Sequence, residues 1–139
     1  HADRAARGSA SRVVVRAIFD ACGSQDEVAR ESDIDYLTGL SGSGPAFPAL
    51  LAAAMMSDAV AHGLPAEIAR RAVNTVISGA GRLLERRDES PDDVVQTFLD
   101  YRGTTAAAID SMRAAGFDAS VATGLSAAFQ KSVSMGKVS

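Results

Sequence analysis

The chain has 139 residues, of which 47% are hydrophobic and 22% charged, and its formal net charge is −3 at pH 7. This length allows one ordinary domain with a real core, and the composition excludes an intrinsically disordered chain. Lysines and arginines are scattered and the net charge is negative, so no nucleic-acid-binding patch is expected.

The cysteine content and the two ends of the chain bear on location and domain limits. Cys22 is the only cysteine, and we expect it to be a small core residue in a reducing compartment, the cytoplasm. No signal peptide is recognisable, and His1 in place of Met suggests a processed, tagged or truncated product. We expect residues 1–11 to be disordered or a linker remnant, residues 12–135 to form one helical domain and residues 136–139 to fray.

Helical signals dominate the first part of the chain. Ser11–Ala21 is predicted to be a helix with its apolar residues on one side and Gly23 as its stop, followed by a polar connector over Ser24–Asp35 with a short turn of helix. No charged residue lies between Tyr36 and Ser57. The strongly apolar part of this segment is about eleven residues, short of the roughly 20 that span a membrane, so we expect a buried helix and no membrane association.

Proline and glycine mark the ends of the central helices. The string GLSGSGPAF predicts a helix with Ser43 or Gly44 as its cap and Pro45 at its first position. This helix ends near His62 with Gly63 as its stop, and a further amphipathic helix follows over residues 65–87.

The last third of the chain repeats this pattern. Ser90 is predicted to cap a helix, and the turn DYRGTT then leads into a helix closed by Gly116. Asp118 is predicted to cap the last helix. Because almost no two-residue alternation occurs, the sequence predicts an all-α domain of about six helices.

The turn DYRGTT is the candidate binding site. The N–H groups at a helix start have no partner within the helix, and the helix dipole adds partial positive charge, so a carboxylate or phosphate can bind there. Gly103 allows a ligand to approach the backbone, Thr104 and Thr105 add hydroxyls, Tyr101 can form a wall and Arg102 adds a full charge. In the plainer alternative, which spacing alone favours, Thr104 is an N-cap and Arg102 solvates the turn.

Other polar residues carry weaker signals. His62 is most simply a cation at a helix C-terminus. Asp58 either has an environment that gives it a function or faces solvent at the helix end. Two histidines without a nearby acidic pair predict no metal site. The chain also has no glycine-rich strand-to-helix turn suited to a dinucleotide.

Four motifs occur in one order with consistent spacing: LTGLSGSGPAF, HGLPAEIARRAV, GTTAAAIDSM and GFDASVATGLSAA. Together they resemble the C-terminal dimerisation domain of pyrroline-5-carboxylate reductase, over about residues 12–131. The resemblance implies an all-α domain intertwined with a second copy, a homodimer for which a higher oligomer stays open. The small-residue helix Ala46–Met56 suits the seam between the two copies.

The resemblance also implies an activity. The family's reductase binds NADPH, or NADH, in a separate N-terminal Rossmann domain and transfers hydride to the C=N carbon of a cyclic imino acid, giving L-proline. The substrate lies between that domain and the partner subunit's helical domain. No Rossmann domain is present in this chain, so by this resemblance we expect it to bind no cofactor alone and to be inactive by itself.

The family's Ser-Pro-Gly-Gly-Thr-Thr loop falls on residues 100–105 of this chain. By this match Gly103 and Thr104 bind the substrate carboxylate and Thr105 acts nearest to the imine nitrogen. Asp100 departs from the pattern and should repel an anionic substrate unless it is paired. Arg102 either supplies that pair or binds the substrate itself, and in place of glycine it is expected to alter the loop.

Three hypotheses follow for the chain. The first makes it the helical half of an imine reductase of proline synthesis. The second makes it a stand-alone, non-catalytic module that dimerises or binds a small carboxylate. The third makes it part of a paralogue that reduces a different imine, because Asp100 and Arg102 alter the loop.

Overall fold

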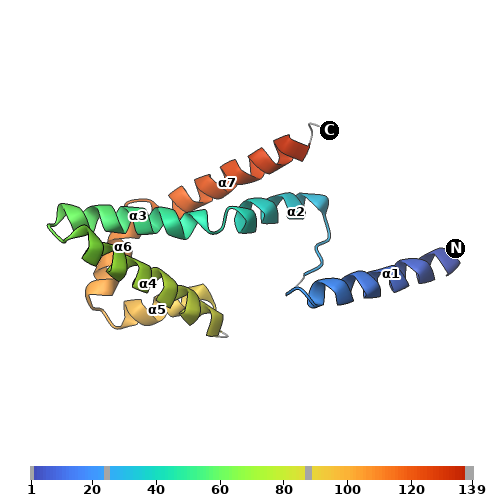
Figure 1. The fold of residues 1–139 in the computed structure, drawn as a ribbon, viewed down its shortest axis with the longest axis horizontal. Coiled ribbons are helices and arrows are strands. Elements are labelled where there is room, and N and C mark those ends of the chain that lie inside the picture. Colours follow the sequence, from blue (N-terminus) through green and yellow to red (C-terminus); the bar gives the residue numbers. More distant parts are fainter. Residues whose placement is uncertain (1, 24–25, 87–88, 137–139) are drawn as a thin grey trace. The chain divides into compact units, whose positions relative to one another are not determined.

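The computed structural model describes the backbone of residues 2–23, 26–86 and 89–136, and the side chains from Ser11 onward within those ranges except that of Arg86. These residues form seven α-helices and one π-helical segment, and they contain no strand, which confirms the all-α class (Figure 1). The elements are α1 (Ala2–Asp20), α2 (Glu31–Leu37), η1 (Thr38–Gly42), α3 (Ala46–Ala61), α4 (Ala66–Arg86), α5 (Pro91–Asp100), α6 (Thr104–Ala114) and α7 (Phe117–Gly136).

The chain divides into two compact units, residues 1–34 and 35–139, where the sequence predicted one helical domain. α1 is helical from Ala2, whereas residues 1–11 were expected to be disordered or a linker. Alanine and arginine, which recur in this segment, are among the best helix formers. Residue 1 and residues 137–139, most of the expected frayed tail, lie outside the described residues.

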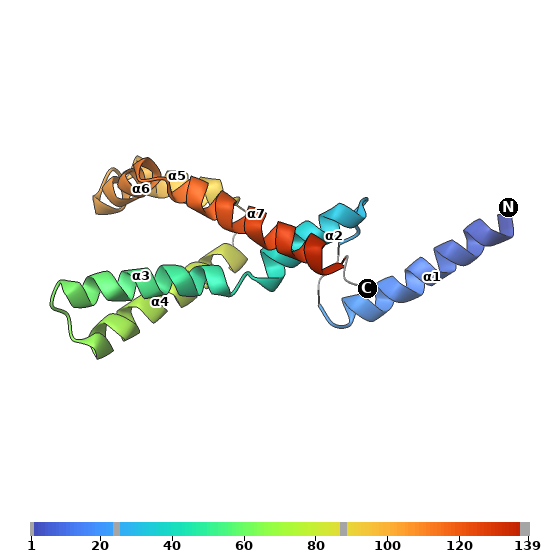
Figure 2. The same cartoon turned by 90° about the horizontal axis from the view of Figure 1, so that it is seen from above.

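α3 and α4 lie side by side and are joined by a short turn (Figures 1 and 2). Gly63 takes a φ of 92° in this turn, and the N–H of Leu64 donates to the carbonyl of Ala59 at 3.1 Å. This glycine-dependent ending confirms the predicted helix stop. Ala69 and Val73 of α4 are the buried side chains of this pair.

The start of α3 differs from the predicted cap. Pro45 is its N-cap and no side chain caps it, because the N–H groups of Ala46 and Phe47 donate to the carbonyls of Ser43 and Gly44. The backbone between η1 and α3 forms a turn at residues 43–45, and the first donors of α3 find main-chain acceptors there.

α5 begins as predicted. The hydroxyl of Ser90 accepts a hydrogen bond from the N–H of Asp93 at 3.2 Å, and the carboxylate of Asp93 accepts one from the N–H of Ser90 at 3.1 Å. This capping box satisfies two donors at the helix start. Gly116, with a φ of 89°, follows α6, and Asp118 lies in the first turn of α7 rather than at its cap.

η1 packs closely on α7. Gly39 is buried there, and a Cβ at this position would lie 3.0 Å from the backbone nitrogen of Phe129. Beside it the rings of Tyr36 and Phe129 lie 6.1 Å apart, and Ser132 donates to the carboxylate of Asp35 at 3.0 Å. These contacts hold the beginning and the end of the second unit together.

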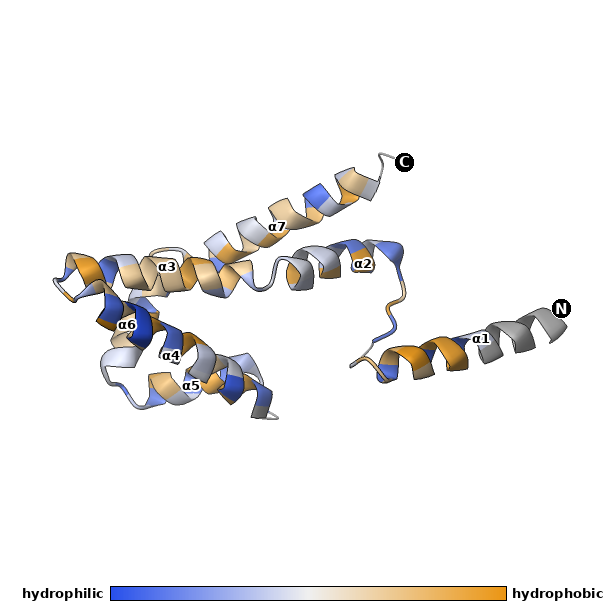
Figure 3. Ribbon diagram, in the orientation of Figure 1, coloured by the Kyte–Doolittle hydropathy of each residue, from blue (hydrophilic) through white to orange (hydrophobic). Residues whose placement is uncertain are grey.

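Little apolar surface is buried by the chain alone. The buried hydrophobic side chains among the described residues are Ala69, Val73, Val94 and Ala106. α3, which is largely apolar (Figure 3), has no buried residue. In the single chain α3 is thus uncovered, and Cys22, which was expected to be a core residue, is exposed.

The segment Glu31–Ala61 meets the length and composition of a membrane-crossing helix, and none of its most apolar window is buried in the chain. This segment is longer than the apolar run of about eleven residues because it joins α2, η1 and α3 across the turn at residues 43–45. A single helix of this kind is weak support for a membrane span, because core helices of soluble proteins meet the same criteria.

Candidate functional site

The turn between α5 and α6 has a sharply defined backbone. Arg102 takes a φ of 51°, in the left-handed region that side chains other than glycine rarely occupy, and its N–H donates to the carbonyl of Leu99 at 3.0 Å. Gly103 is extended, with a φ of −92° and a ψ of −160°, and serves as the N-cap of α6. After three residues outside a helix the chain begins α6 at Thr104.

The start of α6 has no side-chain cap. Gly103 stands at the N-cap position, so the plainer alternative in which Thr104 is the N-cap is wrong. Thr104 and Thr105 are the first two helical residues and are exposed. The N–H groups of this first turn, with two hydroxyls beside them, can donate hydrogen bonds to a carboxylate.

Tyr101 and Ala106 frame this helix start on two sides. A Cβ at Gly103 would lie 3.2 Å from Cδ1 of Tyr101, so the tyrosine ring lies against the glycine, although the residue as a whole is 87% exposed. Ala106 is buried and anchors the first turn of α6, as Val94 does for α5. A glycine at position 103 therefore keeps the aromatic ring close to the backbone donors.

The charged residues of the turn are not paired with each other. Asp100 accepts a hydrogen bond from Nε2 of Gln96 at 2.8 Å, and within the described residues no ion pair joins Asp100 to Arg102. A neutral amide leaves the carboxylate charge in place. Gln96 did not figure among the predicted site residues, although its spacing of four residues from Asp100 on one helix is the signal for such a bond.

Asp58 and His62 contact each other at the end of α3. In sequence they are far from the predicted site residues 100–105. Nδ1 of His62 lies 2.9 Å from the carbonyl oxygen of Asp58 and 3.4 Å from its carboxylate. Both side chains are largely exposed, which fits a histidine at a helix C-terminus.

The described residues do not fit a dinucleotide or a metal ion. They form helices only, so the turn from a strand into a helix that cradles a pyrophosphate has no counterpart among them. No group of three or more His, Cys, Asp or Glu in the part of the chain that the structure describes could hold a metal.

Comparisons with known proteins agree on one family. The sequence pattern described as "Pyrroline-5-carboxylate reductase dimerisation" matches residues 31–135. A pyrroline-5-carboxylate reductase of Synechocystis sp. is 34% identical over 122 residues, which are 88% of this chain and 45% of that protein. A pyrroline-5-carboxylate reductase 3 of Xenopus laevis is 32% identical over 130 residues, 94% of this chain and 47% of that protein.

Solved structures give the same result. A Plasmodium falciparum pyrroline carboxylate reductase with NADP bound has a TM-score of 0.73 at 29% identity, over 92% of this chain and 50% of that one. A pyrroline-5-carboxylate reductase from Coxiella burnetii has a TM-score of 0.77 at 27% identity, over 89% of this chain and 46% of that one. This chain thus spans about half the length of these relatives. It belongs to the pyrroline-5-carboxylate reductase family and carries that family's dimerisation domain.

Proposed function

We propose that the chain is the dimer-forming and substrate-binding half of an NADPH-dependent reductase that converts a cyclic imino acid into L-proline. Membership of the family supports this proposal, as does the NADP bound in a relative of known structure. The observation that carries it is the uncapped start of α6 behind a left-handed Arg102.

The turn offers what a small imino acid needs. The substrate carboxylate would accept hydrogen bonds from the first N–H groups of α6, at Gly103 and Thr104, where the helix dipole favours negative charge. The hydroxyl of Thr105 would lie near the imine nitrogen, which gains a proton when its carbon is reduced. NADPH would supply the hydride. It would be bound by the half of the full-length protein that lies outside this chain.

The proposal includes a homodimer. Leu50 of α3 is 72% exposed, and Ala53 and Ala54 on the same helix are exposed as well. A second copy would cover this largely apolar helix, since small side chains allow two helices to approach closely.

The experiment that tests this function uses the full-length protein that carries this chain. Turnover of pyrroline-5-carboxylate with NADPH would be measured for the wild type, for Thr105→Ala and for the control Thr75→Ala, which removes a surface hydroxyl of α4. We expect Thr105→Ala to lower kcat by about two orders of magnitude, as loss of a positioned proton donor does, and to leave the dimer intact.

The control should behave as the wild type. Equal turnover of Thr105→Ala and wild type would remove Thr105 from the mechanism. A wild-type protein that binds NADPH but reduces no cyclic imino acid would contradict the proposed function and favour the non-catalytic module.

Asp100 forms no ion pair with Arg102 in the described residues and is bonded to a neutral amide. This favours a second candidate, a reductase of the same fold that acts on a different imine. The carboxylate stands where a neutral hydroxyl is expected, and the exposed Arg102 can bind an additional acidic group of a substrate. Combining Arg102→Gly with Asp100→Ser separates the two candidates. If the double variant reduces pyrroline-5-carboxylate faster than the wild type, the natural substrate is a different imine; if turnover is lost, repulsion by Asp100 is not the controlling effect.

A further inference from the structure

Tyr101 is an uncovered aromatic residue within the candidate site. It is 87% exposed, more than Leu50 of α3, which is 72% exposed. Among residues 100–105 it has the only aromatic or aliphatic side chain, and the next apolar residue, Ala106, is buried. A ligand at the start of α6 can therefore find apolar surface in this turn only on the ring of Tyr101.

The backbone of the turn fixes where this ring lies. Tyr101 is the C-cap of α5, with a φ of −68° and a ψ of −16°, and the next N–H, that of Arg102, donates to the carbonyl of Leu99. A Cβ at Gly103 would lie 3.2 Å from Cδ1 and 3.4 Å from Cε1 of the tyrosine. Gly103 is half-buried, whereas the residues on either side of it are exposed. The ring thus lies against the backbone at the point where the free donors of α6 begin.

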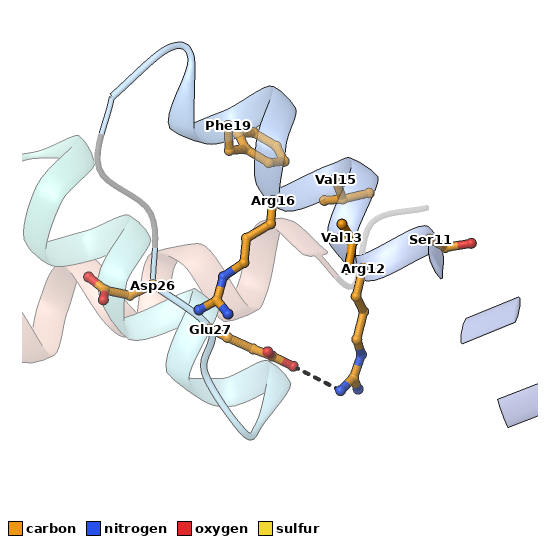
Figure 4. Close-up of a pocket in the computed structure, with 8 residues that line it drawn as sticks. All are labelled: Ser11, Arg12, Val13, Val15, Arg16, Phe19, Asp26 and Glu27. Carbon is orange, nitrogen blue, oxygen red and sulfur yellow. Dashed lines mark ion pairs between the residues drawn. The ribbon is translucent and has the colours of Figure 1, made fainter. Parts of the chain in front are cut away.

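A hollow beside α1 is a second place where an exposed aromatic ring and charged side chains come together. Phe19 and Arg12 line it, and Figure 4 shows Arg12 reaching toward Glu27, with which it pairs at 3.5 Å. The charge of Arg12 is thus matched within the chain, and the hollow lies before residue 31, where the match to the dimerisation domain begins. Tyr101 differs in both respects, because it lies inside that match and beside backbone donors that no side chain caps.

We propose that Tyr101 is a specificity-determining residue of the reductase: its ring is the wall against which the methylene groups of the cyclic imino acid pack, and it limits the ring size that the site accepts. The inference rests on the proposed function. A cyclic imino acid is only a few ångströms across, so a substrate whose carboxylate is bound at Gly103 and Thr104 has its methylene groups close to the tyrosine ring. An aromatic ring offers a large and rigid apolar surface to such groups. A substrate with a sixth ring atom has to displace that surface.

The test compares two substrates in the full-length protein. kcat and KM would be measured for pyrroline-5-carboxylate and for its six-membered homologue, which has one more methylene group in the ring. We expect Tyr101→Ala to raise the KM for pyrroline-5-carboxylate, because apolar contact is lost. The ratio of kcat/KM for the five-membered over the six-membered substrate should fall at least about tenfold, the lower end of what one methylene group contributes to discrimination.

Tyr101→Phe is the matched control, since it keeps the ring and removes only the hydroxyl; it should keep the ratio of the wild type. Because Tyr101 is exposed, its replacement removes little buried surface, and both variants should fold. Neither variant should change the affinity for NADPH or the dimer in sedimentation velocity.

Other outcomes would overturn the assignment. An equal loss of kcat/KM for both substrates in Tyr101→Ala would show that the ring does not select ring size, and an equal change of the ratio in Tyr101→Phe would assign the selection to the hydroxyl. Dissociation of the Tyr101→Ala dimer, or weaker NADPH binding, would show that another part of the protein covers the ring. A wild type that reduces neither substrate contradicts the proposed function itself, whereas a wild type that reduces them with a ratio unchanged in Tyr101→Ala contradicts only the role of Tyr101.

Discussion

Arg102 holds the backbone shape of the candidate site at an energetic cost. The sequence predicted that arginine in place of glycine would alter the loop, yet Arg102 adopts the left-handed region that glycine occupies freely. A side chain in this region costs roughly 1–2 kcal/mol. Strain of this kind is common at binding sites, where the surrounding structure maintains it.

We therefore expect Arg102→Gly to raise the free energy of unfolding by about 1 kcal/mol, because relief of the left-handed strain outweighs the larger backbone entropy of unfolded glycine. Urea unfolding of the full-length protein measures the change. Arg102→Ala is the matched control: it removes the same side chain and keeps the strain, so it should bring no such gain. An equal gain in both variants would locate the effect in the guanidinium rather than in the backbone.

At the scale of single elements, the capping box of α5 makes part of the stability dependent on pH. Hydrogen bonds from the hydroxyl and then from the N–H of Ser90 hold the pKa of Asp93 below its ordinary value. A carboxyl with a lowered folded-state pKa stabilises the fold above its unfolded pKa of about 3.9, and this contribution is lost as the pH falls through the folded pKa.

Ser90→Ala should lower the free energy of unfolding by about 1 kcal/mol near neutral pH, the usual loss for an N-cap serine. The difference between wild type and variant should shrink below about pH 4, because protonated Asp93 no longer gains from the hydroxyl. Denaturant unfolding at a series of pH values measures this. A difference that stays constant down to low pH would exclude a contribution from the charge of Asp93.

The contact between η1 and α7 gives a second test at this scale. In Gly39→Ala the new methyl group would lie 3.0 Å from the nitrogen of Phe129 and 3.2 Å from the carbonyl carbon of Ala128, both backbone atoms, so η1 or α7 must move. We expect a loss of about 1–3 kcal/mol in the free energy of unfolding, as for other overpacked sites. Gly42→Ala in the same segment meets nothing within 4 Å and should not be destabilising. Similar effects of both changes would show that helix propensity, rather than the contact with α7, dominates.

Helix caps and stops, which depend on a few neighbouring residues, were predicted correctly from the sequence. Features that depend on contacts with distant parts of the protein were not. The cap at Ser90 and the stops at Gly63 and Gly116 are set by local hydrogen bonding and backbone angles. η1 was not predicted as a helical segment, and its packing on α7 at Gly39 involves residues far along the chain. The exposure of Cys22 was missed because an apolar pattern predicts burial but does not say which part of the protein supplies the cover.

At the scale of the whole molecule, the single chain leaves an apolar helix and the candidate site uncovered. Its apolar helix α3 has no buried residue, and the left-handed turn at Arg102 lies at the exposed start of α6. Membership of a dimerisation family explains the first feature, because a second copy can cover α3. In the proposed function the second feature has the same explanation, since the substrate would then lie against a surface that another subunit or domain completes.

The dimer seam proposed on α3 is tested by replacing Ala53 and Ala54 with Leu. Both residues are exposed in the single chain, so larger side chains there cause no clash within the subunit. In a close helix–helix contact the added volume cannot be accommodated, and overpacking of this kind costs about 1–3 kcal/mol at each site. The effect is counted twice in a symmetric dimer, because each copy contributes the same helix.

Sedimentation velocity of the full-length variant over a range of concentrations measures the result. We expect the dimer dissociation constant to rise by at least about a hundredfold, the equivalent of some 2.7 kcal/mol. Ala114→Leu at the end of α6 is the matched control, since it adds the same volume at an exposed alanine outside α3 and should leave the dimer unchanged. An unchanged dimer in the Ala53→Leu, Ala54→Leu variant would place the seam on another face and leave the exposed Leu50 without its explanation.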